Sequence, residues 1–393
     1  MIILTFFACM SGVIIIINII LIIVLAGGYA VLIAYYEKLF KKLDIFEPKA
    51  FAPETKFSVI IPARNEEDNI EKCILSILNN DYPHELFEII IADDFSTDTT
   101  AAIVKNLQQQ HNNIKLVQLA DFVGGKLNSY KKKAIELCIE RAANEWIITT
   151  DADCLVPQQW LSYYNSYAQH TDAVFVAAPV MFTNNGSFIS IFQSLDFISL
   201  QGITAASVSA GFHSMCNGAN LAYSKAAFKA VNGFKGVDNI ASGDDMLLMH
   251  KIQKQYPGKI GYLFTPEAIV LTAPMPDWKG FINQRIRWAS KATSYQDKRI
   301  FWVLLLVYIF NLYLVVLPVF AIFYPYYFII WFLLVFAKTF IELDFMRPVA
   351  TFFAQRKMLR WFTIMQPFHI TYTVISGWLG KFGKYEWKKR VVK

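Results

Sequence analysis

Two long uncharged stretches flank a middle section of alternating pattern in this chain of 393 residues. The first stretch runs from Met1 to Tyr36 and contains no charged side chain. Its core, Val13 to Ile33, can cross the roughly 30 Å hydrocarbon layer of a membrane as one helix of about 20 residues. A cleaved signal peptide, the alternative, has a basic segment before a shorter apolar core. Because no Lys or Arg precedes this stretch, residues 1–36 are predicted to be a transmembrane anchor.

The second uncharged stretch runs from Phe301 to Ala337. It is too long for one untilted span, and its length suits a tight two-helix hairpin. Pro318 and Pro325 are expected to bracket the turn. We therefore expect a transmembrane hairpin over residues 300–342.

Lysine and arginine residues are clustered beside the apolar stretches, and the net charge is +6. Basic flanks stay in the cytoplasm, so the N-terminus is expected outside and the middle section inside, as in a multi-pass protein of a plasma (inner) membrane. A third apolar segment, Trp361–Gly380, would move the basic tail outside if it crossed fully. Within residues 343–393 we therefore favour an interfacial or re-entrant segment over a third span. The clusters are Lys38, Lys41 and Lys42; Lys291, Lys298 and Arg299; Arg347, Arg356, Lys357 and Arg360; and Lys388, Lys389, Arg390 and Lys393. Their place beside apolar stretches argues against a nucleic-acid partner.

The middle section, residues 37–277, alternates short β-branched runs with helical periodicity. This alternation predicts an α/β fold with a mostly parallel, doubly wound sheet. Continuous apolar runs are typical of strands that are covered on both faces. The expected strands are 57–63, 87–94, 113–119, 145–153 and 173–180, and the expected helices are 69–78, 97–109 and 129–142. The five cysteines show no metal or redox spacing.

Acidic side chains follow two of the expected strands, where ligands bind in sheets of this kind. Asp151 and Asp153 end one strand, and hard cations such as Mg²⁺ or Mn²⁺ take carboxylate oxygens together with substrate phosphates. A metal there would bridge the protein to a diphosphate, with Asp153 the better direct ligand. Asp94, after the neighbouring strand, can accept a hydrogen bond from a nucleotide base. The alternative for each is a carboxylate that only caps the next turn.

Other polar residues are candidates for the same edge of the sheet. Ala63, Arg64 and Glu66 follow the first strand and are candidates for contact with base and ribose, or for a solvated loop. Lysines before the acidic strand can meet a diphosphate as point charges, and we single out Lys126 and Lys133 from a group that includes Lys131 and Lys132. A solvated helix face is the alternative for most of them.

Asp244 and Asp245 lie about ninety residues after the first acidic pair. Transfer of a group to a hydroxyl needs a base that removes the proton of that hydroxyl, and adjacent carboxylates can raise one another's pKa. Asp245 is our candidate for this base, with Asp244 able to share the role. The alternative is a helix N-terminus stabilised by the helix dipole.

A basic amphipathic helix is expected over residues 278–299. Its spacing places Gln284, Arg287 and Trp288 on one face. Arg287 can bind a phosphate through two parallel hydrogen bonds, and Trp288 can stack on a sugar ring. An interfacial helix that only rests on the membrane is the alternative, and both interpretations can hold together.

Six motifs in order resemble the inverting family 2 glycosyltransferases. They are SVIIPARNEE, IADDFSTDT, DAD, CNGANLAYSKAAF, SGDD and QRIRW. More narrowly, the set is similar to the membrane branch with D, D, D, QxxRW motifs, which includes cellulose, chitin and hyaluronan synthases. The resemblance covers roughly residues 56–300. The GDD sequence departs from the Glu-Asp of many relatives, and the small number of spans puts processive synthesis in doubt.

The resemblance implies a GT-A fold and direct inversion without a covalent intermediate. It implies UDP or a similar nucleotide at Asp94 and a metal at Asp153, with Asp151 near the nucleotide. It also implies a base at Asp245, and Gln284, Arg287 and Trp288 beside the diphosphate and acceptor. Asn217, Gly218 and Asn220 would line the acceptor site. The partners expected are a nucleotide-sugar donor, a glycan or lipid-linked acceptor, and membrane lipid.

Two other classes of function share parts of this pattern. A sugar nucleotidyltransferase would have the sheet and its acidic edge but no clear need for QRIRW beside a membrane. The third class is a transporter or assembly scaffold with an inactive domain. Against it, the spans carry almost no polar residues of the kind that transport needs, and no carboxylate of the motif set is missing. The leading hypothesis is a metal-dependent hexosyl- or N-acetylhexosaminyltransferase.

Overall fold

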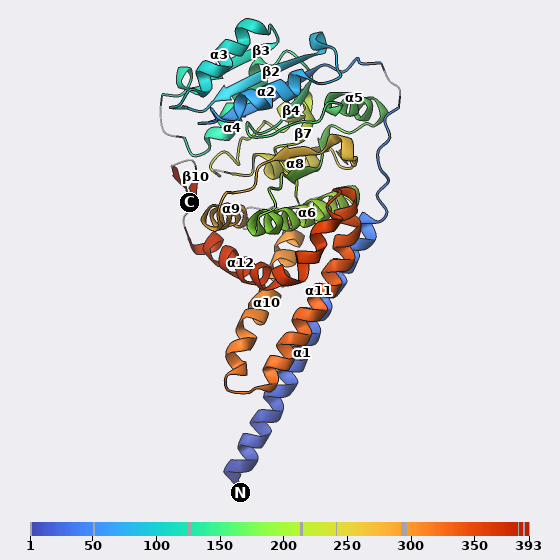
Figure 1. Cartoon of the computed structure of the whole chain (residues 1–393), viewed down its shortest axis with the longest axis vertical. Helices are drawn as coiled ribbons and strands as arrows, with labels where there is room; N and C mark the ends of the chain where they lie inside the picture. The colour runs from blue at the N-terminus through green and yellow to red at the C-terminus, as the bar shows by residue number, and fades with distance from the viewer. Residues whose placement is uncertain are drawn as a thin grey trace.

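The structure is a computed structural model with a broad upper domain and a bundle of helices that extends below it (Figure 1). It describes residues 2–49, 52–124, 127–212, 215–240, 242–291, 297–383, 385–387 and 390–392, with side chains described between residues 18 and 383. Lys126 therefore lies outside the described residues.

A seven-stranded sheet forms the centre of the upper domain, in the order β3-β2-β1-β4-β7-β5-β8. Strand β7 runs antiparallel to β4 and β5, and the other neighbouring pairs are parallel. The strands are β1 Phe57–Ala63, β2 Phe87–Asp93, β3 Ile114–Gln118, β4 Trp146–Thr149, β5 Phe175–Ala177, β7 Leu221–Ser224 and β8 Ile260–Tyr262. The expected α/β fold with a mostly parallel, doubly wound sheet is confirmed.

Helices cover both faces of this sheet, which explains the continuous apolar strands. Along β1, Val59 and Ile61 belong to the apolar core on one face, and Ile60 belongs to the core on the other. The first core is closed by α2 Ile70–Leu78, α3 Thr100–Gln110 and α5 Trp160–His170. The second is closed by α4 Tyr130–Arg141, α6 Phe188–Ser209, α7 Lys225–Ala230 and α8 Asp244–Gln255.

Short elements complete the chain. Strand β6, Val180–Phe182, pairs in parallel with β9, Val270–Thr272. Strands β10, Tyr385–Trp387, and β11, Arg390–Val392, form an antiparallel pair near the C-terminus. The 3₁₀ turns are η1 His84–Leu86, η2 Leu119–Asp121, η3 Pro266–Ala268 and η4 Arg356–Trp361.

Three helices extend downward from the domain, and one lies across their upper end (Figure 1). The downward helices are α1 Ile2–Phe40, α10 Lys298–Ala321 and α11 Tyr326–Phe352, and the crossing helix is α12 Phe362–Phe382. Helix α12 packs on α9, Trp278–Ala289, which carries the QRIRW motif. Buried side chains of α1, α10, α11 and α12 join the apolar core under the sheet. The helices and the domain therefore share one continuous core.

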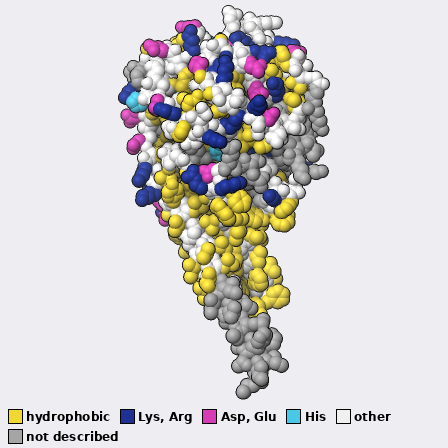
Figure 2. Space-filling model, turned by 180° about the vertical axis from the view of Figure 1, so that it is seen from behind, with side chains coloured by type: hydrophobic (Ala, Val, Ile, Leu, Met, Phe, Trp, Pro, Cys, Tyr) yellow, Lys and Arg dark blue, Asp and Glu magenta, His cyan; other side chains and the backbone are white. Residues whose placement is uncertain are grey.

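Among the described residues, three helical segments are long and apolar enough to cross a membrane: Asn18–Phe40, Phe188–Ser209 and Lys298–Ala321. The segment of α6 is 72% buried inside the protein, against 22% and 28% for those of α1 and α10. Helix α6 is thus a core helix, and the sequence analysis did not predict it. Figure 2 shows hydrophobic side chains over the lower part of the molecule and Lys and Arg side chains above them.

The expected hairpin corresponds to α10 and α11, which pack against each other. Pro325 is the N-cap of α11, whereas Pro318 lies inside α10. Helix α11 continues to Phe352, beyond the expected limit at residue 342.

Candidate active site

A cavity of about 350 Å³ lies at the carboxyl ends of β1, β2 and β4. Side chains from distant parts of the sequence line it, because parallel strands deliver their C-terminal loops to one edge of the sheet. The expected site residues that line it are Ala63, Arg64, Glu66, Asp94, Asp151, Asp153, Asn217, Gly218, Asp244, Asp245, Gln284, Arg287 and Trp288.

One side of the cavity, where contacts with a nucleotide were expected, is built from the loops after β1 and β2. The backbone N–H of Asp94 donates to the Ala63 carbonyl at 2.8 Å, which ties the two loops together. The Arg64 guanidinium donates to the carbonyl oxygens of Asp94 at 2.7 Å and Phe95 at 3.2 Å. Phe95 has a φ of 53°, a left-handed conformation that turns the chain sharply after Asp94. Asp94 is only 2% exposed, so its carboxylate is held in place at the cavity wall.

Strand β4 ends at Thr149, and Asp151 and Asp153 lie in the turn that follows it. The Thr272 hydroxyl, at the end of β9, donates to Asp153 Oδ2 at 3.2 Å. Burial and the charges of Asp151 and Glu66 raise the pKa of Asp153 to about 6. Concentrated negative charge of this kind favours a bound cation.

A divalent metal fits this group of carboxylates. Among the described residues, no three His, Cys, Asp or Glu side chains are arranged to hold an ion alone. Mg²⁺ is commonly held by one or two carboxylates together with substrate phosphates. Asp153 and Asp151 match that pattern and would hold the metal together with a substrate diphosphate.

Lys131 connects the two acidic motifs, and the sequence analysis did not single it out. Its Nζ lies 2.8 Å from Asp151 Oδ1 and 3.2 Å from Asp244 Oδ2. Burial alone would lower the pKa of Lys131, but the charges of Asp151 and Asp244 outweigh it and hold the pKa above its ordinary value. Lys131 is therefore a fixed positive charge inside the cavity. Lys131 and Lys133 are two residues, about half a helix turn, apart, so the rotation of α4 against the sheet decides which of them faces the cavity.

The other lysines of this group have different roles. Lys132 is buried and donates to the carbonyl oxygens of Val237, Ile240 and Ser242, which holds the segment before α8 in place. Lys133 pairs with Glu136 on the same helix at 3.7 Å and does not line the cavity. Lys133 therefore does not lie at the cavity where it was expected, whereas Lys131 does.

Asp244 and Asp245 begin α8, after Gly243 in a left-handed conformation with φ 80°. Burial alone would raise the pKa of Asp244, but Lys131 and Lys291 outweigh it and hold the pKa below its ordinary value. Asp245 Oδ2 accepts from the backbone N–H of Gly218 at 3.3 Å. Asp244 is thus held as a charged partner of Lys131, and Asp245 stays the candidate base that the sequence suggested.

Asn220 does not reach the cavity and is fully buried. Its Oδ1 accepts from Trp160 Nε1 and from the Tyr164 hydroxyl, each at 2.9 Å. Its Nδ2 donates to two backbone carbonyl oxygens at 2.7 Å. Both polar atoms of this amide are therefore hydrogen-bonded inside the domain. Asn220 does not line the acceptor site as expected, and its role is structural.

Helix α9 closes the cavity with Gln284, Arg287 and Trp288. Arg285, the remaining cation of QRIRW, is 4% exposed and turns toward α6. Its Nη1 donates to Gln284 Oε1 at 2.6 Å, and its guanidinium lies 4.3 Å from the centre of the Trp288 ring. Arg285 therefore orients two of the side chains that line the cavity.

Known families match the same part of the chain. The profile described as Glycosyl transferase family 2 matches residues 58–231, and the profile described as Glycosyl transferase family group 2 matches residues 146–340. Together the two matches span residues 58–340 and support the glycosyltransferase family that the ordered motifs suggested.

Individual relatives are more distant. The poly-β-1,6-N-acetyl-D-glucosamine synthase of Staphylococcus epidermidis is 26% identical over 240 residues, which are 59% of this chain and 53% of that protein. The glycosyltransferase AglE of Haloferax volcanii is 30% identical over 139 residues, which are 35% of this chain and 44% of that protein. The chain thus aligns with about half the length of these relatives.

A solved structure supports the fold of the whole chain. The mannosyltransferase PcManGT from Pyrobaculum calidifontis, in complex with GDP-Man and Mn²⁺, has a TM-score of 0.55 and 19% identity. The similarity covers 91% of this chain and 97% of that chain. The family 2 domain therefore has the GT-A fold that was expected.

Proposed function

We propose that the protein is an inverting, metal-dependent glycosyltransferase that moves a sugar from a nucleotide-sugar donor to a glycan or lipid-linked acceptor at a membrane. The observation that carries this proposal is the convergence of Asp94, Asp153, Asp245 and Arg287 on one cavity. In the sequence these residues come from four separate motifs. A volume of about 350 Å³ lies at the low end of the roughly 300–1,000 Å³ typical of ligand sites.

In this proposal the donor lies across the edge of the sheet. Asp94 accepts from the base, while Ala63, Arg64 and Glu66 line the nucleotide side. Asp153 and Asp151 hold the metal, which would stabilise negative charge on the departing diphosphate. Arg287 and Lys131 add positive charge beside the same phosphates. We propose a uridine nucleotide, in keeping with the N-acetylglucosamine polymer named for the Staphylococcus relative.

Transfer then takes place in one displacement. Asp245 removes the proton of the acceptor hydroxyl as its oxygen attacks C1 of the sugar. The bond between C1 and the diphosphate oxygen breaks on the opposite face, so the configuration at C1 inverts. The electron pair of that bond leaves with the nucleoside diphosphate. Gly218 and Asn217 lie beside Asp245, and Trp288 offers a ring face to the acceptor sugar.

The membrane arrangement belongs to the same proposal. Helix α1 and the α10–α11 hairpin would cross the membrane, and α12 would lie at the interface below a cytoplasmic catalytic domain. Large side chains of the downward helices are exposed, as at Ile23 (65%), Ile329 (64%) and Phe332 (58%). Exposed apolar area of this extent is typical of contact with lipid.

Turnover by the full chain in lipid nanodiscs tests the proposal. The protein is given UDP- and GDP-sugars with Mg²⁺ or Mn²⁺, and released nucleotides are separated by chromatography. We expect a nucleoside diphosphate, whereas released pyrophosphate would indicate a nucleotidyltransferase. Asp153→Asn and Asp245→Asn should abolish release, while the exposed Asp172→Asn, which removes an ion pair with Lys259, should not. Undiminished turnover in either site variant contradicts the assignment.

A further inference from the structure

A second cavity of about 1030 Å³ lies between the catalytic domain and the helices α1, α10, α11 and α12. We call it the membrane-side chamber. It meets the donor cavity at Asn217, Asp245, Trp288 and Lys291, which line both. Asp244 lines only the donor cavity. The proposed base therefore lies where the two cavities join.

The walls of the chamber are largely apolar. They include Leu195 and Ile203 of α6, Val307 of α10 and Met365 of α12. The chamber also extends to the apolar outer surface of two helices. Four of its lining side chains are exposed there: Phe301 (39%), Leu304 (40%), Trp378 (59%) and Phe382 (64%).

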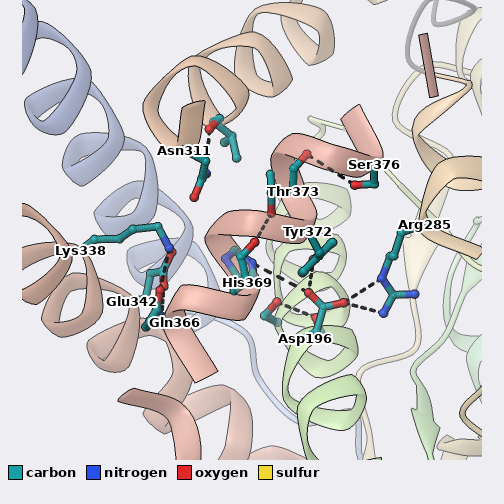
Figure 3. A network of polar contacts seen from close by, with 12 residues as sticks. Asp196, Arg285, Asn311, Lys338, Glu342, Gln366, His369, Tyr372, Thr373 and Ser376 are labelled. Carbon is teal, nitrogen blue, oxygen red and sulfur yellow. Dashed lines mark hydrogen bonds and ion pairs between the residues drawn. The ribbon is translucent and has the colours of Figure 1, made fainter. Parts of the chain in front are cut away.

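Two buried carboxylates of the chamber wall, Asp196 and Glu342, have partners within the protein (Figure 3). Asp196 accepts from Arg285 and from the Tyr372 hydroxyl. Glu342 accepts from Lys338 at 2.6 Å and from Gln366 at 2.5 Å. These contacts neutralise the buried carboxylates and occupy their oxygens.

Four of the serine and threonine hydroxyl groups that line the chamber are committed to the backbone. Ser199, Thr204, Thr373 and Ser376 each donate to a carbonyl oxygen of their own helix. A sugar chain buried here would lose water without gaining enough hydrogen bonds, which is costly. A hydrocarbon chain has no such requirement.

We propose that the membrane-side chamber binds the hydrocarbon chain of an amphiphilic acceptor, a membrane lipid whose polar head presents the accepting oxygen to Asp245. The polar junction formed by Asn217, Ser242, Asp245 and Lys291 would take the head. The proposal rests on the proposed function and specifies its acceptor. It places the lipid chain between α6, α10 and α12, with a path from the apolar surface to the base.

The test compares acceptors that share one head group and differ only in chain length. The probes are methyl, butyl, hexyl and octyl β-glycosides of glucose and N-acetylglucosamine, given to the full chain in nanodiscs with the active donor. We expect the KM for the acceptor to fall as the chain lengthens, by up to about fourfold for each methylene that becomes buried. Val307→Trp, which fills the chamber, should flatten this dependence and leave hydrolysis of the donor by water unchanged.

A matched control lies on the same helix. Val316 is 37% exposed and does not line the chamber, so Val316→Trp should keep the wild-type dependence. Ile203→Trp fills the chamber from α6 and decides the outcome if Val307→Trp also loses donor hydrolysis. The proposal is overturned if both chamber variants keep the wild-type dependence, or if methyl glycosides or free oligosaccharides match the octyl glycosides. Failure of the wild-type protein to release any nucleoside diphosphate would instead contradict the proposed function.

Discussion

Arg285 on α9 and Asp196 on α6 form a buried ion pair, with Arg285 Nε 2.9 Å from Asp196 Oδ2 (Figure 3). The same guanidinium contacts Gln284 and stacks on Trp288, so it connects the core helix to the roof of the donor cavity. On its other oxygen, Asp196 accepts from Tyr372 of α12. The helix proposed to lie at the membrane interface is thus joined to the catalytic helix through one carboxylate.

Removing the charge of Asp196 should destabilise the protein and disturb the roof of the cavity. Asp196→Asn leaves Arg285 buried without its counter-charge, and breaking a buried pair in this way costs about 3–5 kcal/mol. We expect a lower Tm in nanodiscs and a loss of sugar transfer. Asp344→Asn is the matched control, because its pair with Arg347 is 56–60% exposed and should contribute only ~0–1 kcal/mol. Equal Tm values for the two variants would show that the buried pair does not hold α9.

Arg285→Lys separates orientation from charge. Lysine keeps one positive charge but lacks the planar fork that binds Asp196 and Gln284 together. We expect the variant to fold, with kcat lowered roughly 10-fold or more, while Arg299→Lys at an exposed pair leaves kcat unchanged. Measurement of kcat and of KM for the donor distinguishes the two effects. A wild-type kcat in Arg285→Lys would mean that Gln284 and Trp288 are oriented without it.

Lys131 should be the lysine of α4 that matters for transfer. Lys131→Met removes the charge between Asp151 and Asp244, so the like-charged carboxylates would repel and the diphosphate would lose a positive neighbour. We expect kcat to fall by about 10²-fold, the scale of losing one well-placed electrostatic contact in a site. Lys133→Met, at a lysine two residues along α4 that pairs with Glu136, should be near wild type. A larger loss of kcat in Lys133→Met than in Lys131→Met would instead support the sequence-based prediction that Lys133 contacts the donor.

The sequence predicted the sheet because both of its faces are covered, which leaves long apolar runs that periodicity can detect. It also placed the acidic motifs correctly at one edge, since parallel strands end together. It could not distinguish Lys131 from Lys133, because that depends on how α4 is rotated against the sheet. Helix α6 was missed because Gln193, Asp196 and Gln201 interrupt its apolar pattern. Those polar groups are buried by tertiary contacts that a single segment does not reveal.

Gly218 tests how closely the acceptor loop must approach the carboxylates. A Cβ at this position would lie 3.2 Å from Asp244 Oδ2 and 3.7 Å from Asp245 Cβ. We expect Gly218→Ala to displace the carboxylates by a few tenths of an ångström and to lower kcat, with little change in Tm. Gly27→Ala in α1 has open space at its Cβ position and should leave kcat unchanged. Unchanged kcat in Gly218→Ala would show that this approach is not needed for transfer.

Asp153 should make both metal binding and stability depend on pH. Its pKa is raised to about 6 by burial and by the charges of Asp151 and Glu66, whereas an unfolded aspartate titrates near ~3.9. Between these values the folded protein without metal binds more protons than the unfolded chain. Its free energy of unfolding therefore falls as the pH rises through this window. A bound metal needs the ionised carboxylate, so half-saturation by Mn²⁺ should require more metal as the pH drops below about 6.

Asp153→Asn separates this effect from catalysis. The variant should lose transfer, yet at pH 7 with chelator it should be more stable than the wild type by about 1–3 kcal/mol, since one pKa unit corresponds to about 1.4 kcal/mol. Near pH 4, where the wild-type carboxyl is neutral, the two proteins should have similar Tm values. Asp172→Asn, at an exposed ion pair, controls for a change of charge at the surface. The outcome that contradicts this prediction is a Tm of the wild-type protein, measured with chelator, that does not fall relative to that of Asp153→Asn between pH 4 and 7. It would show that the carboxylates do not repel one another. The main electrostatic reason to place a cation at this turn would then be lost.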